Sequence, residues 1–407
     1  MLRVTLDDGT IQRYAVPLSP GAAPVDALTD EQFVRCLLEL VRNDARVAGR
    51  AGVVTGHRTR AFPAALPNDA PARALRGEQS NTSVVIGDAL ILKHFRRLED
   101  GVSPDLEITR FLTETADFPH TPALAGWLAY GTDGEGETPA TLAVLQALVR
   151  EARDGWEWML AAVRDEGRRP TTLSALRRLG AITAELHLAL ARAPAGAPLL
   201  AAEPIADADI TRWAAGAAAQ LMAARAAAPP GTSVPVVPAA ELRDALAALR
   251  GRVKCRHHGD FHLGQTLYRS STNAWTIIDF EGEPLRPLAE RRQKHSPLRD
   301  IAGMLRSIAY AAETTRAGAP GTWIDRWETG ARAAFLSGYL TAAAGAAFLP
   351  DSDANVRRVV AAFEVEKAAY EIVYEANNRP AWITIPARGL VRAVAAMARS
   401  RQDPGGA

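Results

Sequence analysis

Residues 1–6 and 10–16 alternate roughly between apolar and polar side chains, and short apolar runs follow up to residue 149, a pattern that predicts β-strands. Residues 1–6 and 10–16 are expected to form a hairpin, because Asp7-Asp8-Gly9 between them is a turn sequence. Further strands are expected at 83–86, 89–95 and 140–149, with helices at 30–43 and 105–115.

The rest of the chain has mainly helical periodicity. Leu176, Leu179 and Ile182 recur at helical spacing within residues 174–191. Further helices are expected at 209–227, 298–313, 323–344, 353–377 and 389–399, with short strands at 253–257 and 275–280. Strands followed by helices are typical of an α+β protein, so we expect a strand-rich N-terminal lobe and a helical C-terminal lobe.

Composition excludes several classes of protein. The 407 residues carry 47 basic and 46 acidic side chains, so no excess of charge indicates binding to nucleic acid. Cys36 and Cys255 are too few for a disulfide framework. Charges interrupt the N-terminal apolar residues, and no uncharged run is long enough to span a membrane. These features predict a cytoplasmic protein without a membrane partner.

The most informative stretch is 258–265, His-Gly-Asp-Phe-His-Leu-Gly-Gln. Gln265 follows Asp260 by five residues, and Asp279 comes after the next predicted strand. Protein kinases space an acidic base, an amide metal ligand and a metal-binding aspartate in this way. Carboxylate and amide oxygens suit Mg²⁺, which bridges the phosphates of ATP. The alternative is that these are polar loop residues next to strands.

Lys93 is unusual because this chain strongly prefers arginine and the lysine lies in an apolar strand. Its compact ammonium suits the α- and β-phosphates of a nucleotide. Glu107, on the following predicted helix, is the expected partner that positions it. The alternative is a surface lysine whose stem packs on apolar neighbours.

A polar segment precedes this strand, with small side chains that suit a phosphate-binding turn. An ordinary hairpin turn would have the same composition. The candidate phosphate-binding residues are Ser80, Asn81, Thr82 and Ser83.

Together these segments resemble the maltokinase family, whose fold is similar to those of aminoglycoside phosphotransferases and protein kinases. The resemblance covers roughly residues 1–400 and includes the maltokinase portion of trehalose synthase fusions. It rests on motifs at 78–83, 92–97, 104–107, 258–265, 279–284, 287–291, 296–306 and 370–380.

The resemblance implies transfer of the ATP γ-phosphate to the anomeric hydroxyl of maltose, a step that feeds α-glucan synthesis from trehalose. Asp260 would be the catalytic base, and Gln265 and Asp279 would hold Mg²⁺. Gln146 to Val149 would form the hinge around adenine. Trehalose synthase would be a possible partner.

The resemblance also implies three parts of the chain. Residues 1–70 would be a cap subdomain, 71–149 the N-terminal kinase-like lobe, and 150–407 the C-terminal lobe. Ala381 departs from the family pattern, which has an Asp there, beside the expected sugar-binding region.

One helix carries the candidate sugar-binding residues. Tyr370 and Tyr374 share a face, as do Glu371 and Glu375, because each pair is four residues apart. Aromatic rings pack on sugar C–H faces, and the carboxylates and Arg379 can bind hydroxyls. The alternative is a core helix with half-buried tyrosines.

Other polar residues have structural interpretations. His258 is placed with the substrate-binding residues, although support of the catalytic loop explains it well. His187 is expected to be a packing histidine, and Arg299 and Asp300 are expected to anchor the start of a helix.

Two rival functions remain open at this point. One is a kinase of the same fold that acts on another small acceptor, such as glucosamine. The other is a non-catalytic partner that docks trehalose synthase.

Overall fold

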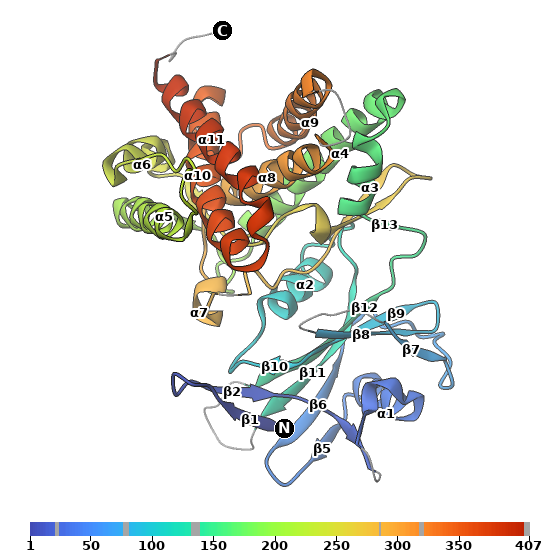
Figure 1. Cartoon of the computed structure of the whole chain (residues 1–407). Coiled ribbons are helices and arrows are strands. Elements are labelled where there is room, and N and C mark those ends of the chain that lie inside the picture. Colours follow the sequence, from blue (N-terminus) through green and yellow to red (C-terminus); the bar gives the residue numbers. More distant parts are fainter. Residues whose placement is uncertain (21–23, 76–80, 132–138, 285, 317–320, 403–407) are drawn as a thin grey trace. The chain divides into compact units, whose positions relative to one another are not determined.

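A computed structural model describes residues 1–20, 24–75, 81–131, 139–284, 286–316 and 321–402 (Figure 1). The chain divides into two compact units. The sheet unit comprises Met1–Glu151 and Ile278–Arg291, and the helical unit comprises Ala152–Ile277 and Arg292–Ala407. The segment Ile278–Arg291 therefore returns to the sheet unit although the chain on both sides of it belongs to the helical unit.

The sheet unit is built on a seven-stranded sheet of order β5-β6-β11-β12-β9-β8-β7, in which every neighbouring pair is antiparallel. These strands are β5 (Arg46–Ala48), β6 (Val53–Arg58), β7 (Ala72–Ala74), β8 (Asn81–Ile86), β9 (Leu90–Phe95), β11 (Leu124–Gly131) and β12 (Ala140–Ala147). The other elements are β1 (Leu2–Thr5), β2 (Ile11–Tyr14), β3 (Leu18–Ser19), β4 (Val25–Asp26), β10 (Arg97–Leu98), α1 (Glu31–Arg42), α2 (Pro104–Glu114) and α7 (Leu288–Arg291).

Helix α1 packs its apolar face on this sheet, as Figure 1 shows beside β6. Val34, Leu38 and Val41 are buried in one core cluster with residues of the central strands. The spacing of Thr29 and Gln32 predicts Thr29 as the N-cap, but Asp30 takes this role and its side chain accepts a hydrogen bond from the Gln32 N–H. Thr29 instead is the last residue of the preceding 3₁₀ turn Ala27–Thr29, so its backbone belongs to that turn and not to the start of α1.

The helical unit contains long helices with short strands. The helices are α3 (Gly155–Val163), α4 (Arg169–Ala191), α5 (Asp207–Ala227), α6 (Ala239–Leu246), α8 (Leu298–Thr315), α9 (Gly321–Ala342), α10 (Asp353–Asn378) and α11 (Thr384–Gln402). The strands are β13 (Arg153–Asp154), β14 (Glu203–Pro204), β15 (Val253–Lys254), β16 (Thr266–Arg269) and β17 (Ala274–Ile277). None of the described helices is both long enough and apolar enough to cross a membrane.

Helices α4 and α9 approach so closely that only glycine fits at two positions. A Cβ at Gly338 would overlap the backbone carbonyl of Arg177, and a Cβ at Gly180 would overlap that of Phe335. The two glycines thus let one helix backbone lie directly against the other. This contact holds α4, and with it the buried His187, against α9.

The α+β prediction is confirmed, with a strand-rich N-terminal part and a helical C-terminal part. The predicted strands at 253–257 and 275–280 are shorter, because β15 ends at Lys254 and β17 ends at Ile277. Strands β5, β6 and β11 were not predicted. The predicted boundary between the cap subdomain and the N-terminal lobe, at residue 70, falls between β6 and β7, which belong to the same sheet. The cap subdomain stays a prediction.

Gly338→Ala should destabilise the protein by about 1–3 kcal/mol, because the added methyl group meets a helix backbone that cannot rotate away. Gly216→Ala in α5 is the matched control, since nothing lies within 4 Å of its Cβ position. That change should stabilise the protein by about 0.5–1 kcal/mol through helix propensity. Chemical denaturation measures both, and equal effects would contradict the close approach.

Candidate functional site

Lys93 lies at the centre of a cluster of three carboxylates in the sheet unit. It is on β9, paired with Ser83 of β8 and Val144 of β12. Its ammonium lies 3.2 Å from an oxygen of Asp105 and 2.5 Å from one of Glu281, and it also bonds to Asp279. The lysine side chain is only 16% exposed, so it is not the solvated surface lysine of the alternative interpretation.

The carboxylate that reaches Lys93 from helix α2 is Asp105, not the expected Glu107. Ser103 caps this helix and Pro104 begins it, which places Asp105 in the first turn, fully buried. Residues two apart on a helix point about 200° apart, so Asp105 and Glu107 lie on different faces. The sequence correctly indicated an acidic residue on this helix but selected the wrong position.

The charges of the cluster do not cancel. Burial alone would lower the pKa of Lys93. The negative charges of Asp105, Asp279 and Glu281 outweigh this effect and raise the pKa well above its usual range. Burial, with the neighbouring carboxylates Asp279 and Asp105, raises the pKa of Glu281 despite the opposing effect of Lys93. Three carboxylates around one ammonium leave an excess of negative charge that favours a further cation.

The oxygens of the three carboxylates lie within 4.8 Å of one another, which suits a divalent metal ion. Hard carboxylate oxygens are the ligands that Mg²⁺ prefers. Asp279 is the metal ligand predicted from the sequence, whereas Glu281 was not among the predicted residues. The signal was present, since Glu281 is inserted between Phe280 and Gly282 of what would otherwise be an Asp-Phe-Gly sequence.

Asp279 has an unusual backbone. Its φ is 66°, in the left-handed region that non-glycine residues seldom adopt. Such conformations are concentrated at functional sites, where surrounding contacts hold them. Here the bond between Asp279 and Lys93 supplies such a contact.

The predicted phosphate-binding residues are only partly described. Ser80 lies outside the described residues, and Asn81, Thr82 and Ser83 open strand β8. The Asn81 side-chain amide donates a hydrogen bond to Glu281 at 2.7 Å. Thr82 accepts one from Arg96 at 2.9 Å, so this hydroxyl is already engaged.

The predicted hinge residues lie where the chain leaves the sheet unit. Gln146 is buried in β12, opposite Ile91 of β9. Val149 is half-buried two residues after this strand ends, and the sheet unit continues to Glu151.

In the helical unit, a buried carboxylate holds the backbone of the 258–265 loop. Asp300 accepts hydrogen bonds from the N–H groups of His258 at 2.7 Å and Gly259 at 3.0 Å. His187 lies 3.0 Å from the same carboxylate through Nε2, and its Nδ1 lies 2.9 Å from the Tyr339 hydroxyl. Asp300 therefore does more than start a helix: it fixes the loop.

Electrostatics support this role of Asp300. Although burial would raise the pKa of Asp300, the nearby His257 and the hydrogen bond from His187 lower it below its usual range. Burial lowers the pKa of His257 to about 4, so this ring is neutral at pH 7. His187 is fully buried with both ring nitrogens in contact, as expected of a packing histidine.

Asp260 lies on this loop with its side chain 19% exposed. Lys367 of α10 donates a hydrogen bond to it at 3.0 Å, and His262 Nε2 lies 3.9 Å away. His258 is almost fully buried, and its Nδ1 accepts a hydrogen bond from the Asp260 N–H at 3.4 Å. This ring faces its own loop, which agrees with a supporting role.

Gln265 ends the 3₁₀ turn Leu263–Gln265 and is half-buried. It belongs to the helical unit, whereas Asp279 belongs to the sheet unit. The shared role of these two residues in metal binding stays a prediction.

The candidate sugar-binding helix is α10, and arginines engage its two glutamates. Arg306 bonds to Glu371 at 2.7 and 3.0 Å, and Arg379 bonds to Glu375 at 2.8 and 3.0 Å. These carboxylates therefore have fixed orientations.

The aromatic residues of α10 differ in exposure. Tyr370 is half-buried under the ammonium of Lys367, which lies 4.9 Å from the ring centroid. Tyr374 is 42% exposed, with the guanidinium of Arg379 5.7 Å from its ring centroid. Tyr374 is thus the more accessible of the two rings predicted to stack on a sugar.

Residues 71–343 match the phosphotransferase enzyme family (APH). The chain is 28% identical over 397 residues to a glucosamine kinase of Streptacidiphilus jiangxiensis, covering 93% of this chain and 80% of that protein. It is 29% identical over 332 residues to a glucosamine kinase of Mycolicibacterium smegmatis, covering 77% of each chain.

Solved structures are similar in fold. A glucosamine kinase in complex with glucosamine, ADP and inorganic phosphate superimposes with a TM-score of 0.72 at 22% identity, over 95% of this chain and 88% of that one. Crystal form A of a glucosamine kinase superimposes with a TM-score of 0.73 at 23% identity, over 95% of this chain and 86% of that one. These similarities agree with the kinase-like α+β fold.

The family match extends from strand β7 to the end of α9, and it includes Lys93, Asp260 and Asp279. Because it covers more than half of the residues, this chain belongs to the phosphotransferase enzyme family.

Proposed function

We propose that this protein is an ATP-dependent kinase that phosphorylates a hydroxyl group of an aminosugar such as glucosamine. The observation that carries the proposal is the cluster of Asp105, Asp279 and Glu281 around Lys93. Phosphoryl transfer needs mainly positioning and neutralisation of phosphate charge, which a lysine and a metal-binding acidic cluster can supply.

Asp279 and Glu281 would hold Mg²⁺, with Gln265 as the amide ligand indicated by the sequence. A bound Mg²⁺ would neutralise charge on the β- and γ-phosphates. Lys93 would then contact the phosphates, and Asp105 would hold the lysine in position. Asn81 supports this arrangement because its amide orients the Glu281 carboxylate.

Asp260 would orient the attacking hydroxyl and accept its proton. Two contacts support this assignment: Lys367 holds the carboxylate, and Asp300 fixes the backbone immediately before it. A base on a loop fixed in this way needs little rearrangement to reach an acceptor hydroxyl.

The choice of an aminosugar rests on two relatives named glucosamine kinase, one of which aligns with 93% of this chain. Ala381, where the maltokinase pattern has an Asp, also argues against maltose. Maltose remains the second candidate because the segments at 258–265 and 370–380 resemble maltokinases. A non-catalytic partner of trehalose synthase is the third, and it would not need an intact metal-binding cluster.

The acceptor is tested by measuring ADP release and ³¹P NMR spectra with Mg·ATP and glucosamine, glucose or maltose. We expect kcat/KM for glucosamine to exceed that for maltose by about 100-fold or more, because a site with polar groups that pair with one substrate rejects analogues lacking that pairing. A preference for maltose would replace the aminosugar proposal. If none of the three sugars increases ADP release, both proposals are rejected.

Asp260→Asn should lower kcat by about 10²–10⁴-fold, since the variant keeps the hydrogen-bonding shape but loses the proton acceptor. The Kd for Mg·ATP should stay within about twofold because Asp260 is assigned to the acceptor. Asp207→Asn, a surface aspartate paired with Arg250, is the control and should behave as wild type. Near-normal turnover of Asp260→Asn would remove this residue from its role.

Asp105→Asn and Glu107→Gln distinguish the two acidic residues of α2. The first should lower kcat/KM for ATP by about tenfold or more, because Lys93 loses one charge-assisted hydrogen bond. The second should change it by less than about twofold. Steady-state kinetics, with melting curves to verify folding, provide the measurement. The reverse order of effects would restore the assignment made from sequence.

A further inference from the structure

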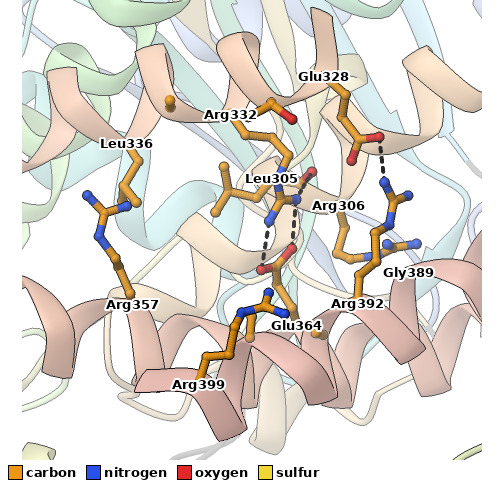
Figure 2. A pocket seen from close by; sticks show the side chains of 14 residues that line it. Leu305, Arg306, Glu328, Arg332, Leu336, Arg357, Glu364, Gly389, Arg392 and Arg399 are labelled. Carbon is orange, nitrogen blue, oxygen red and sulfur yellow. Dashed lines mark hydrogen bonds and ion pairs between the residues drawn. The ribbon is translucent and has the colours of Figure 1, made fainter. Parts of the chain in front are cut away.

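Helices α8, α9, α10 and α11 of the helical unit enclose a cavity of about 460 Å³ (Figure 2). This volume is within the range of small-molecule sites in proteins. Part of the wall is apolar and is formed by Leu305, Leu336 and Ala393. The cavity can therefore contact the carbon skeleton of a ligand as well as a charged group.

The lining is strongly basic. Two glutamates, Glu328 and Glu364, face it, whereas the chain as a whole balances 47 basic residues with 46 acidic ones. The arginines of the lining are Arg306, Arg332, Arg357, Arg392 and Arg399. The charge in this cavity is therefore a local feature and not a reflection of overall composition.

Three of these arginines are held by carboxylates. Arg332 bonds to both oxygens of Glu364, at 2.8 and 2.9 Å, and Arg392 bonds to Glu328 at 2.8 Å. Figure 2 draws these bonds as dashed lines. Arg306 bonds to Glu371, which does not line the cavity.

Arg357 and Arg399 are different. Within the part of the chain that the structure describes, neither guanidinium has a hydrogen-bond or ion-pair partner. Arg357 lines the cavity from α10 and Arg399 lines it from α11. In Figure 2 no dashed line reaches either guanidinium. Two unpaired guanidiniums thus line the same cavity as a fixed arginine network.

We propose that this cavity binds a phosphate monoester of about the size of a sugar phosphate. Guanidinium groups match phosphate oxygens in geometry and charge, and a partly enclosed site strengthens these contacts. Arg357 and Arg399 would bind the phosphate, and the apolar wall would contact the carbon skeleton. Free inorganic phosphate has the same anionic group, so the test separates the two sources.

This site is distinct from the acidic cluster at Lys93, which would repel a phosphate monoester without a metal ion. The inference does not depend on the acceptor proposed above. Arg306 nevertheless lines the cavity and bonds to Glu371, which connects the cavity to the candidate sugar-binding helix.

The test is isothermal titration calorimetry at low salt, with Mg²⁺ and a non-hydrolysable ATP analogue saturating the nucleotide site. The probes are glucose 6-phosphate, inorganic phosphate and glucose. We expect one additional molecule of glucose 6-phosphate to bind per chain. Tighter binding of inorganic phosphate would identify free phosphate as the ligand source, because it would show that the carbon body contributes nothing.

The double variant Arg357→Gln, Arg399→Gln should weaken binding of the phosphate ester by about tenfold or more, with kcat and the melting temperature near wild type. The matched control is Arg243→Gln, Arg326→Gln, which removes the same charge from exposed positions outside the lining. It should leave the affinity unchanged.

Ala333→Glu provides a second variant, since Ala333 is an exposed lining residue and a carboxylate there would repel the anion. It should also weaken binding. Absence of phosphate binding to the wild type at millimolar concentration, or equal loss in the control variant, would overturn the proposal and leave the cavity as a solvated cluster of arginines.

Discussion

The imbalance of charge at Lys93 is the constraint on which the candidate site depends. One ammonium cannot neutralise Asp105, Asp279 and Glu281, and like charges at such short separations repel one another in a partly buried site. The same contacts hold the segment Ile278–Arg291 in the sheet unit, although the chain before and after it belongs to the helical unit. An ion pair between Arg291 and Glu99 fixes the far end of this segment. The cluster is therefore the proposed Mg²⁺ site, and it also attaches the returning segment Ile278–Arg291 to the sheet unit.

A buried carboxylate has the opposite character in the helical unit. Both carboxylate oxygens of Asp300 are in hydrogen-bond contact, with the backbone N–H groups of His258 and Gly259 and with the ring of His187. Such a group stabilises one conformation of a loop instead of attracting a ligand. Asp260, two residues after the fixed His258, remains partly exposed and is held by a single lysine. The difference between a saturated carboxylate and an accessible one separates the positioning residue from the proposed base.

Helix α10 connects several of these features through its sequence spacing. Glu364 and Glu371 are seven residues apart and hold Arg332 and Arg306, while Lys367 between them holds Asp260. Arg306 can reach Glu371 because Gly389 of α11 has no side chain, since a Cβ there would overlap its guanidinium. One helix therefore contacts the proposed base, the proposed sugar-binding region and the arginine-lined cavity.

Much of the fold and part of the site followed from the sequence alone. The helices of the C-terminal part were predicted well, because helical periodicity is a local property of residues three and four apart. Phosphoryl transfer was also indicated locally, because residue types and their spacing along the chain can be read without the fold. The residues concerned are Lys93, Asp260, Gln265 and Asp279. Strands β6 and β11 were missed, since their pairing is stabilised by strands distant in sequence and by the packing of α1.

Only the tertiary structure decided which side chains meet. It selected Asp105 over Glu107, because the direction of a helical residue depends on how the helix lies against the sheet. It brought Glu281 to Lys93 across nearly 190 residues, and it gathered arginines from four helices at one cavity. Sequence determined the chemistry available in this chain, whereas the packing of distant segments determined which groups share a site, because charge and hydrogen bonding act only over a few ångströms.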